Sequence, residues 1–242
     1  MSTVGSAEGV ELTYKSLYRF GGAAALVVAL LTVMEVIVFT LYPQPSTVSG
    51  WFELFQVSPI VGLLDFWGLE ILMYAMYAMV FLALYVVLRR VNQSGTAIAF
   101  TLALLGIAIF FATNNPFSML SLSSNYAAAT TNVQRSTLLA AGEAVLANTN
   151  QRIVGGFNIG FFLVSAAGLV VSLVMLQGRS FSRLIAYVGV LAFGLSLADY
   201  LRQALTSSVA IALLVILPGA LLIVVWFCLV GLRLLQLGRV GG

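Results

Sequence analysis

Six long apolar runs constrain the fold of this chain more than any other feature of its sequence. They cover residues 17–42, 64–90, 96–115, 152–177, 182–204 and 208–236. A helix needs about 20 apolar residues, each rising about 1.5 Å, to cross about 30 Å of hydrocarbon. The runs therefore predict an all-α fold, a polytopic transmembrane bundle of six spans. The whole chain, 1–242, is expected to be one transmembrane domain with a short N-terminal tail over 1–16.

The balance of charged residues supports a membrane setting. Charged side chains make up 8% of the chain, whereas soluble domains carry about 25%. The basic residues stand singly or in pairs at the ends of the apolar runs, without the basic stripe that nucleic-acid binding requires. Membrane lipids are therefore the expected surroundings, and nucleic acid is not expected as a partner.

Basic residues are divided unequally between the two ends of the predicted spans. With the N-terminus inside, the inner ends hold Lys15, Arg19, Arg89, Arg90, Arg179, Arg183, Arg233 and Arg239. The outer ends hold only Arg135, Arg152 and Arg202. Short cytoplasmic loops are enriched in Lys and Arg. The sequence thus predicts a multi-pass protein of the inner (plasma) membrane with both termini in the cytoplasm.

The absence of histidine excludes several classes of membrane enzyme. Without histidine there is no His-ligated zinc or haem and no Ser–His catalytic pair. The one lysine, Lys15, precedes the first span, so no retinal-type Schiff base can form inside the bundle. We expect no cofactor and no metal. An enzyme is the third choice and would depend on carboxylates, tyrosines and serines alone.

Two segments at the outer side have an amphipathic character. Residues 47–62 place Trp51 and Phe52 beside Glu53, as expected for a segment in the membrane interface. Residues 133–148 have apolar side chains at helical spacing but are too polar to cross a membrane. The sequence predicts two outer interfacial amphipathic helices that cover the bundle.

Three segments of the chain carry a family resemblance. They are residues 50–65, 118–147 and 174–193, of which 118–147, with its Asn-Tyr-Ala-Ala-Ala motif, is the most specific. Over residues 15–200 the chain resembles a bacterial family of six-helix integral membrane proteins catalogued only as a domain of unknown function. The resemblance implies the fold, the topology and a bacterial inner-membrane setting. It implies no activity, cofactor or catalytic residue.

Polar residues within the spans gather toward the outer face. The candidates for a pocket or for ion pairs are Glu35, Asp65, Glu70, Tyr74, Tyr77, Arg152, Asn158, Asp199 and Arg202. Acidic residues within spans are costly, and they usually mark function or buried pairs. These residues indicate an outward-facing polar pocket. The alternative interpretation is structural, with an i,i+3 pair of Asp199 and Arg202 and with Asp65 and Arg152 at headgroup level.

Glu35 and Glu70 favour the functional interpretation because each lies further from a helix end. Glu70 shares a helix face with Tyr74 and Tyr77, at spacings of i+4 and i+7. An ionised carboxylate toward the bilayer centre costs at least about 2.5 kcal/mol. We therefore expect Glu35 to face the bundle interior and to be held by a partner on another helix, with Arg152 or Arg202 as first choice.

The fourth span carries a row of small residues, here called a seam, and the sixth span contains a proline. Gly156 and Gly160, extended by Gly155 and Gly168, allow close helix approach, and packing within the bundle is favoured over a dimer interface. Pro218 lies near the middle of the sixth span and is expected to kink it.

Two functions remain open from the sequence alone. The first is binding or transport of a small molecule, an ion or a lipid through an outward-facing polar pocket. The alternative is a structural or accessory subunit that packs against other membrane subunits in a larger complex, or in a homo-oligomer. An open cavity lined by the carboxylates would favour the first, and ion pairs that close on themselves would favour the second.

The charge bias leads to a topology prediction. Cysteines introduced at Ser94 and Ser180 should resist a membrane-impermeant thiol reagent in intact cells, because both positions fall at the predicted cytoplasmic side. A cysteine at Ser124 should be labelled. Labelling at Ser94 together with protection at Ser124 would invert the predicted orientation.

Overall fold

The computed structural model describes residues 14–149, 158–205 and 209–239, and all its regular elements there are helices. Within these ranges six helical segments are long and apolar enough to cross a membrane: Lys15–Leu41, Pro59–Leu88, Gln93–Ala128, Ile159–Gln177, Arg183–Gln203 and Leu214–Arg239. The predicted all-α fold with six spans is confirmed. Residues 152–157, the predicted start of the fourth span, lie outside the described residues.

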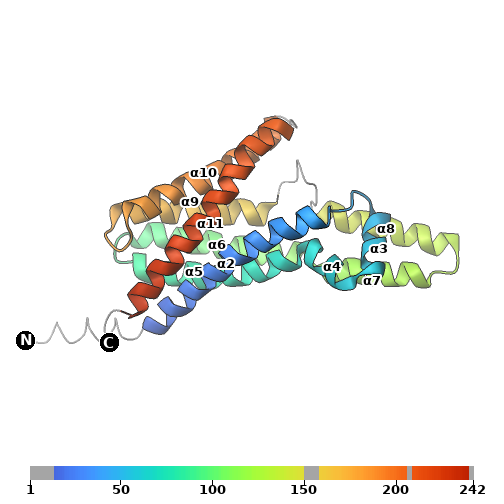
Figure 1. The fold of residues 1–242 in the computed structure, drawn as a ribbon, viewed down its shortest axis with the longest axis horizontal. Coiled ribbons are helices and arrows are strands. Elements are labelled where there is room, and N and C mark those ends of the chain that lie inside the picture. The colour runs from blue at the N-terminus through green and yellow to red at the C-terminus, as the bar shows by residue number, and fades with distance from the viewer. Residues whose placement is uncertain (1–13, 150–157, 206–208, 240–242) are drawn as a thin grey trace, which may run out of the picture.

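The six main helices form a closed ring in chain order. They are α2 (Lys15–Leu41), α5 (Leu69–Leu88), α6 (Gln93–Thr113), α9 (Ile159–Gln177), α10 (Arg183–Leu205) and α11 (Val209–Arg239). Each packs against the next one, and α11 packs against α2 to close the ring. Figure 1 shows α5, α6 and α9 running along the long axis of the molecule, with α11 crossing them obliquely. The chain order thus brings the first and last spans together.

Glycines bring neighbouring helices into close contact. A Cβ atom at Gly22 of α2 would lie 2.8 Å from the carbonyl oxygen of Gly231 in α11. A Cβ atom at Gly106 of α6 would lie 2.8 Å from the carbonyl oxygen of Gly160 in α9. In lipid, helices associate through such close packing because no hydrophobic effect drives them together. Gly168 lies in the same way against the ring of Phe193 in α10, so two glycines of the predicted seam contact helices of their own chain.

Side chains fill the interior of the ring in the half where α2 begins and α11 ends. Buried residues of this core include Val28 of α2, Phe81 and Leu84 of α5, and Trp226 and Val230 of α11. The last turn of α11 lies beside the first turn of α2. The described chain therefore begins and ends at the same end of the bundle, as an even number of spans requires.

A cap of three helices extends from the other end of the ring. It consists of α3 (Val48–Val57), α7 (Pro116–Ala128) and α8 (Asn132–Thr149), and Figure 1 shows α7 and α8 extending beyond the six main helices. The cap has its own small core, formed by Val48, Trp51, Phe52, Phe55, Phe66 and Met119. Ser123 Oγ donates a hydrogen bond of 2.8 Å to the carbonyl oxygen of Phe52, which ties α7 to α3.

The cap contains the two segments predicted to be amphipathic helices. Residues 133–148 fall in α8, whose Leu139, Val145 and Leu146 pack against the cap core. Residues 47–62 form two helices, α3 and α4 (Pro59–Leu63), because Ser58 has an extended backbone, as the residue before a proline prefers. Figure 1 shows α8 lying beside α7 along the direction of the spans. The placement of the two segments at the lipid interface stays a prediction.

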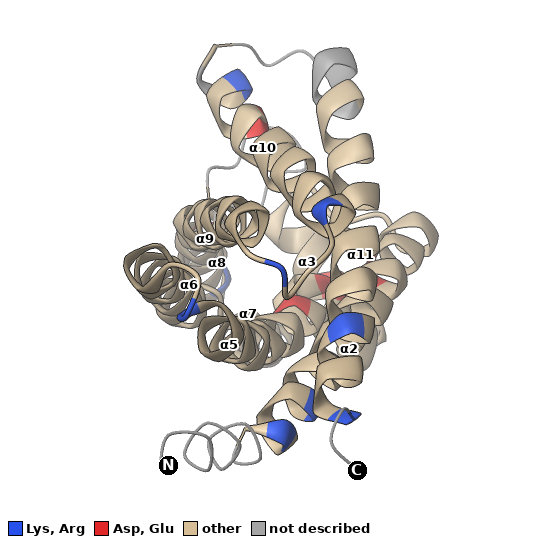
Figure 2. Ribbon diagram, turned by 90° about the vertical axis from the view of Figure 1, so that its left-hand side faces the viewer, with Lys and Arg blue, Asp and Glu red and all other residues tan. Residues whose placement is uncertain are grey.

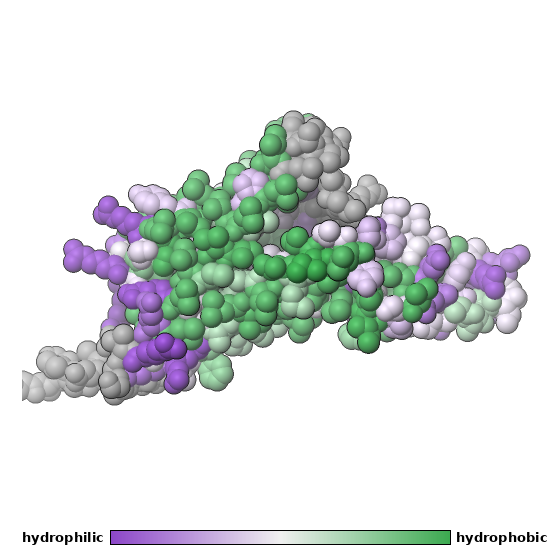
Figure 3. Space-filling view, viewed as in Figure 1, coloured by the Kyte–Doolittle hydropathy of each residue, from purple (hydrophilic) through white to green (hydrophobic). Residues whose placement is uncertain are grey.

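The hydropathy of the surface changes along the long axis of the molecule. Figure 2, which looks onto the end where α2 begins and α11 ends, shows Lys and Arg positions in blue on the ribbons around that end. Figure 3 shows a hydrophilic end, a broad hydrophobic band over the spans, and a mixed surface on the cap. We call the first of these the basic end. It gathers the residues that the charge bias assigned to the cytoplasm, and that assignment stays a prediction.

The close contact at Gly106 leads to a stability prediction. Gly106→Ala should lower the free energy of unfolding by about 1–2 kcal/mol, because the added methyl group meets the backbone of α9 and overpacking exceeds the gain in helix propensity. Gly194→Ala in α10 is the matched control, since a Cβ atom there meets nothing within 4 Å. Gly194→Ala should be neutral or stabilising. Thermal unfolding in detergent measures both, and equal melting temperatures for the two variants would contradict the α6–α9 contact.

Candidate functional site

The second span is broken where it leaves the cap. A π-helical segment, η1 (Leu64–Gly68), separates α4 from α5, and Phe66 and Trp67 within it have non-helical backbone angles. Trp67 has φ 67°, the one positive φ at a non-glycine residue among those described. Such a conformation costs about 1–3 kcal/mol at a bulky residue. The break turns the Trp67 ring toward the bundle, where it contacts Phe110 and Phe161.

Gly68 makes the break possible. A Cβ atom at this position would collide with the carbonyl oxygen of Leu63, so any larger residue would force the π-turn open. The apolar run over 64–90 predicts one continuous helix, whereas the structure breaks it at η1. Gly68, three residues after Asp65 in an otherwise apolar run, is the signal that could have indicated it.

A cavity of about 610 Å³ lies among α2, α5, α9, α10 and α11. Its volume falls within the range of about 300–1,000 Å³ typical of small-molecule sites. The polar side chains in its lining are Thr32, Glu35, Gln44, Glu70, Tyr77, Asn158, Ser165, Ser196, Asp199, Tyr200 and Gln203. Aromatic rings line it as well: Phe39, Trp67, Phe161, Phe193 and Phe227. The cavity thus combines a few converging polar groups with a largely apolar wall.

The cavity occupies the half of the bundle that is remote from the basic end. Glu35 stands about 27 Å along its helix from Leu17, at 1.5 Å per residue, and Glu70 lies in the first turn of α5. The floor is formed by the stacked rings of Tyr77 and Phe227, whose centroids are 5.3 Å apart. Trp226 packs edge-on against Phe227 and is fully buried. The core below this floor separates the cavity from the basic end.

The carboxyl groups of Glu35 and Glu70 meet in the cavity. They approach from α2 and α5, and both line the cavity close enough for the two carboxyl groups to interact. Glu70 is 2% exposed, and its Oε2 atom accepts no hydrogen bond from any described residue. Among the described residues the neighbour of Glu35 on another helix is Glu70, because the ring places α2 directly beside α5. Of the two arginines expected to hold Glu35, Arg202 pairs with Asp199 and Arg152 lies outside the described residues.

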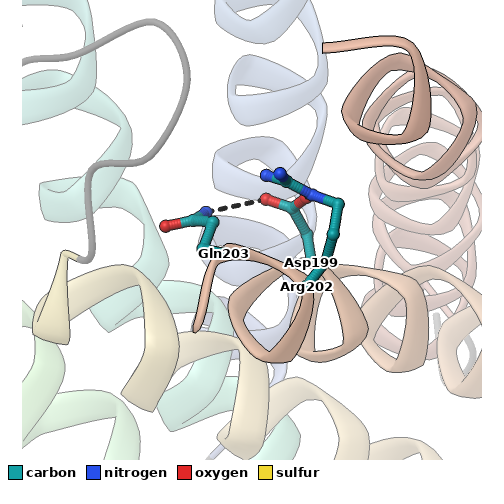
Figure 4. A network of polar contacts seen from close by, with 3 residues as sticks. All are labelled: Asp199, Arg202 and Gln203. Carbon is teal, nitrogen blue, oxygen red and sulfur yellow. Dashed lines mark hydrogen bonds and ion pairs between the residues drawn. The ribbon is translucent and has the colours of Figure 1, made fainter. Parts of the chain in front are cut away.

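Asp199 and Arg202 form an ion pair on one face of α10, at the predicted i,i+3 spacing. Arg202 Nε lies 2.5 Å from Asp199 Oδ1. Gln203 Nε2 donates a hydrogen bond of 2.8 Å to the other oxygen, Asp199 Oδ2. Figure 4 shows Arg202 and Gln203 approaching the carboxylate from two sides. The charge of Asp199 is thus balanced within its own helix.

Asp65 and Tyr74, two other candidates, lie outside the cavity lining. Asp65 is fully buried in η1, and its carboxylate oxygens have no hydrogen-bond partner among the described residues. Gln44 Nε2 donates instead to the main-chain oxygen of Asp65, at 3.1 Å. The Tyr74 ring stacks on Phe110 with 3.8 Å between centroids. Both residues support the walls of the cavity rather than face into it.

Asn158 and Gly160 mark the start of α9. Asn158 lines the cavity and caps the helix, its Oδ1 accepting a hydrogen bond of 3.2 Å from the Phe161 amide. Gly160 packs on α6 and has no part in the lining. Two further candidates, Arg152 and Gly156, lie outside the described residues. In the described part of the chain, no group of three or more His, Cys, Asp or Glu side chains is placed to hold a metal ion.

Several cavity residues of α10 are not among the candidates predicted from the sequence. Ser196, Asp199, Tyr200 and Gln203 all line the cavity. Their spacing of i, i+3, i+4 and i+7 places them on one helix face. This polar stripe in an apolar helix is visible in the sequence, and Asp199 is its one member among the predicted candidates.

The ion pair of α10 leads to a double-mutant prediction. Arg202→Met should lower the free energy of unfolding by about 3–5 kcal/mol, because it leaves Asp199 buried without its basic partner. Asp199→Asn combined with Arg202→Met should recover a large part of that loss, since no unpaired charge remains. Chemical unfolding in detergent measures the cycle. A double variant as unstable as the sum of the two single variants would show that the charges are not coupled.

Comparison with known families places the chain among proteins of unknown activity. Residues 63–231 match the family described as "Domain of unknown function (DUF4386)". The match begins beside the break of the second span and includes Glu70, Asn158 and Asp199. Comparisons with curated proteins and with solved structures return no match. Because the matched region covers more than half of the chain, this integral membrane protein belongs to the DUF4386 family.

Proposed function

We propose that this membrane protein binds a small molecule in the cavity among α2, α5, α9, α10 and α11. The observation that carries the proposal is the cavity itself, about 610 Å³ in volume. In its wall lies the Glu70 Oε2 atom, which has no hydrogen-bond partner among the described residues. A buried polar atom without a partner is unfavourable in an empty site. A bound ligand would supply the missing partner.

The arrangement of α2 and α11 supports an entrance from the side. The two helices touch near the basic end, where Gly22 meets Gly231, and diverge toward the other end (Figure 1). The surface is hollowed between them in Figure 3. Phe39 of α2 and Ile216 of α11 both line the cavity there. A ligand dissolved in the adjacent lipid leaflet would enter between these helices.

The orientation of the cavity follows from the basic end. If that end faces the cytoplasm, as the positive-inside rule implies, the cavity opens toward the outer leaflet of a bacterial inner membrane, and both termini are cytoplasmic. Binding needs only this arrangement. Transport requires in addition that the floor between Tyr77 and Phe227 opens. Pro218 in α11, which removes one backbone hydrogen bond, is adjacent in sequence to the lining residue Gly219.

The alternative, an accessory subunit of a larger complex, gains less support. The seam glycines that could have packed against a partner helix, Gly160 and Gly168, contact α6 and α10 of the same chain. The exposed apolar side chains of α2 and α11 are those that any lipid-facing helix carries. No described feature distinguishes a partner surface from a lipid surface.

Cysteine accessibility tests whether the cavity is open. In a Cys228→Ser background, Ser196→Cys should react with a small thiol reagent, because Ser196 lines the cavity. Ser172→Cys is the matched control, since Ser172 is fully buried in α9 and bonded to the Gly168 carbonyl. Ser172→Cys should react at least tenfold more slowly. Equal rates at the two positions would contradict an open cavity.

Protection from labelling then tests binding. Compounds that raise the melting temperature of the protein in lipid nanodiscs should also slow the alkylation of Ser196→Cys. Glu35→Gln should leave the melting temperature of the free protein unchanged or raised, and should abolish the ligand-dependent increase. A compound set spanning amines, carboxylates and uncharged lipids that never protects Ser196→Cys would refute binding in this cavity.

A further inference from the structure

The charged and titratable groups around the cavity are mainly acidic. In the described residues they are Glu35 of α2, Asp65 of η1, Glu70 and Tyr77 of α5, and Asp199 and Tyr200 of α10. The lining residues of α9 and α11 carry no charge. Asp199 is paired with Arg202, whereas Glu35 and Glu70 have each other. Among the described lining residues the cavity therefore presents negative charge and no basic side chain.

Two ionised carboxylates cannot lie in contact at low dielectric, because their repulsion is too large. A carboxylate is only an acceptor, so a hydrogen bond between Glu35 and Glu70 needs a proton on one of them. The O–H group of one then donates to the other, and the pair carries a single negative charge. One negative charge therefore remains on the two carboxyl groups when they share a proton.

The aromatic wall complements the acidic pair. The rings of Trp67 and Phe161 lie 6.2 Å apart, and those of Tyr77 and Phe227 are stacked at the floor. Aromatic faces attract cations, and cages of such rings recognise quaternary ammonium groups. A hard metal ion instead needs six or more oxygen ligands, and the described residues offer no group of three metal-ligating side chains. The rest of the cavity lining is largely apolar and would suit an apolar part of the ligand.

We propose that the ligand is an organic cation, such as a protonated amine or a quaternary ammonium with an apolar body, and that its binding displaces the proton shared by Glu35 and Glu70. This inference rests on the proposed binding function. One cation enters and one proton leaves to water, so the net charge of the site is unchanged. Both carboxylates are ionised in the complex, with the cation between them and the aromatic rings.

Two ions of matched size and opposite charge test the inference. Tetraphenylphosphonium and tetraphenylborate are titrated into the full-length protein in nanodiscs by calorimetry, with empty nanodiscs as the blank. Tetraphenylphosphonium should bind and release about one proton, measured from the difference between buffers of unequal ionisation enthalpy. Its affinity should rise up to tenfold per pH unit while the pair holds its proton, because protons and cation compete. Tetraphenylborate should not bind above the blank.

Conservative variants locate the proton. Glu35→Gln and Glu70→Gln should each weaken binding of tetraphenylphosphonium at least tenfold and abolish proton release. Glu53→Gln is the matched control, because Glu53 is an exposed carboxylate on the cap helix α3, and it should bind like the wild type. Should a variant fail to fold, the pH dependence of the wild-type protein still decides the question.

The outcomes separate this inference from the proposed function. Equal binding of both ions, or binding of tetraphenylphosphonium without proton release, would overturn the cation–proton exchange. Absence of tetraphenylphosphonium binding, with an uncharged compound protecting Ser196→Cys, would overturn the exchange and leave the binding function intact. An unreactive Ser196→Cys would instead refute the open cavity on which both proposals rest.

Discussion

The hydrocarbon of the bilayer offers no hydrogen bonds, and this constraint governs where each polar group of the chain can lie. Most of the described basic side chains lie at the basic end of the ring, where Arg233 also donates to the Ser180 carbonyl. Acidic side chains lie deeper and need another solution. Asp199 has Arg202 beside it, while Glu35 and Glu70 meet inside a cavity. The buried acidic side chains among the described residues are thus confined to one half of the bundle.

The shape of the ring explains why that half is hollow. Near the basic end, α2 and α11 touch through Gly22 and Gly231, and large side chains fill the core. Toward the cap the same helices diverge, and the strained backbone at Trp67 ends the regular helix of the second span. Irregular backbone at membrane depth is tolerated where protein or a cavity surrounds it. Close packing at one end and divergence at the other leave the cavity between them.

Much of the fold could be predicted from the sequence, because span length and charge placement depend on each segment alone. The six spans and the Asp199–Arg202 pair are of this kind. The neighbour of Glu35 could not be predicted, since it depends on which helices pack together. Helix packing depends on tertiary contacts, such as that between Gly22 and Gly231. Helix α7 was missed because its serines and asparagine resemble loop composition, although the cap core stabilises it as a helix.

The shared proton of Glu35 and Glu70 is most directly tested by infrared difference spectroscopy with and without tetraphenylphosphonium. The carbonyl stretch of a protonated carboxylic acid should be lost when the cation binds. This loss should be absent in Glu35→Gln and in Glu70→Gln and retained in Asp65→Asn, whose carboxylate lies outside the cavity lining. A spectrum in which bound cation leaves that band unchanged, or in which both glutamine variants still lose it, would contradict a proton held between these two carboxyl groups.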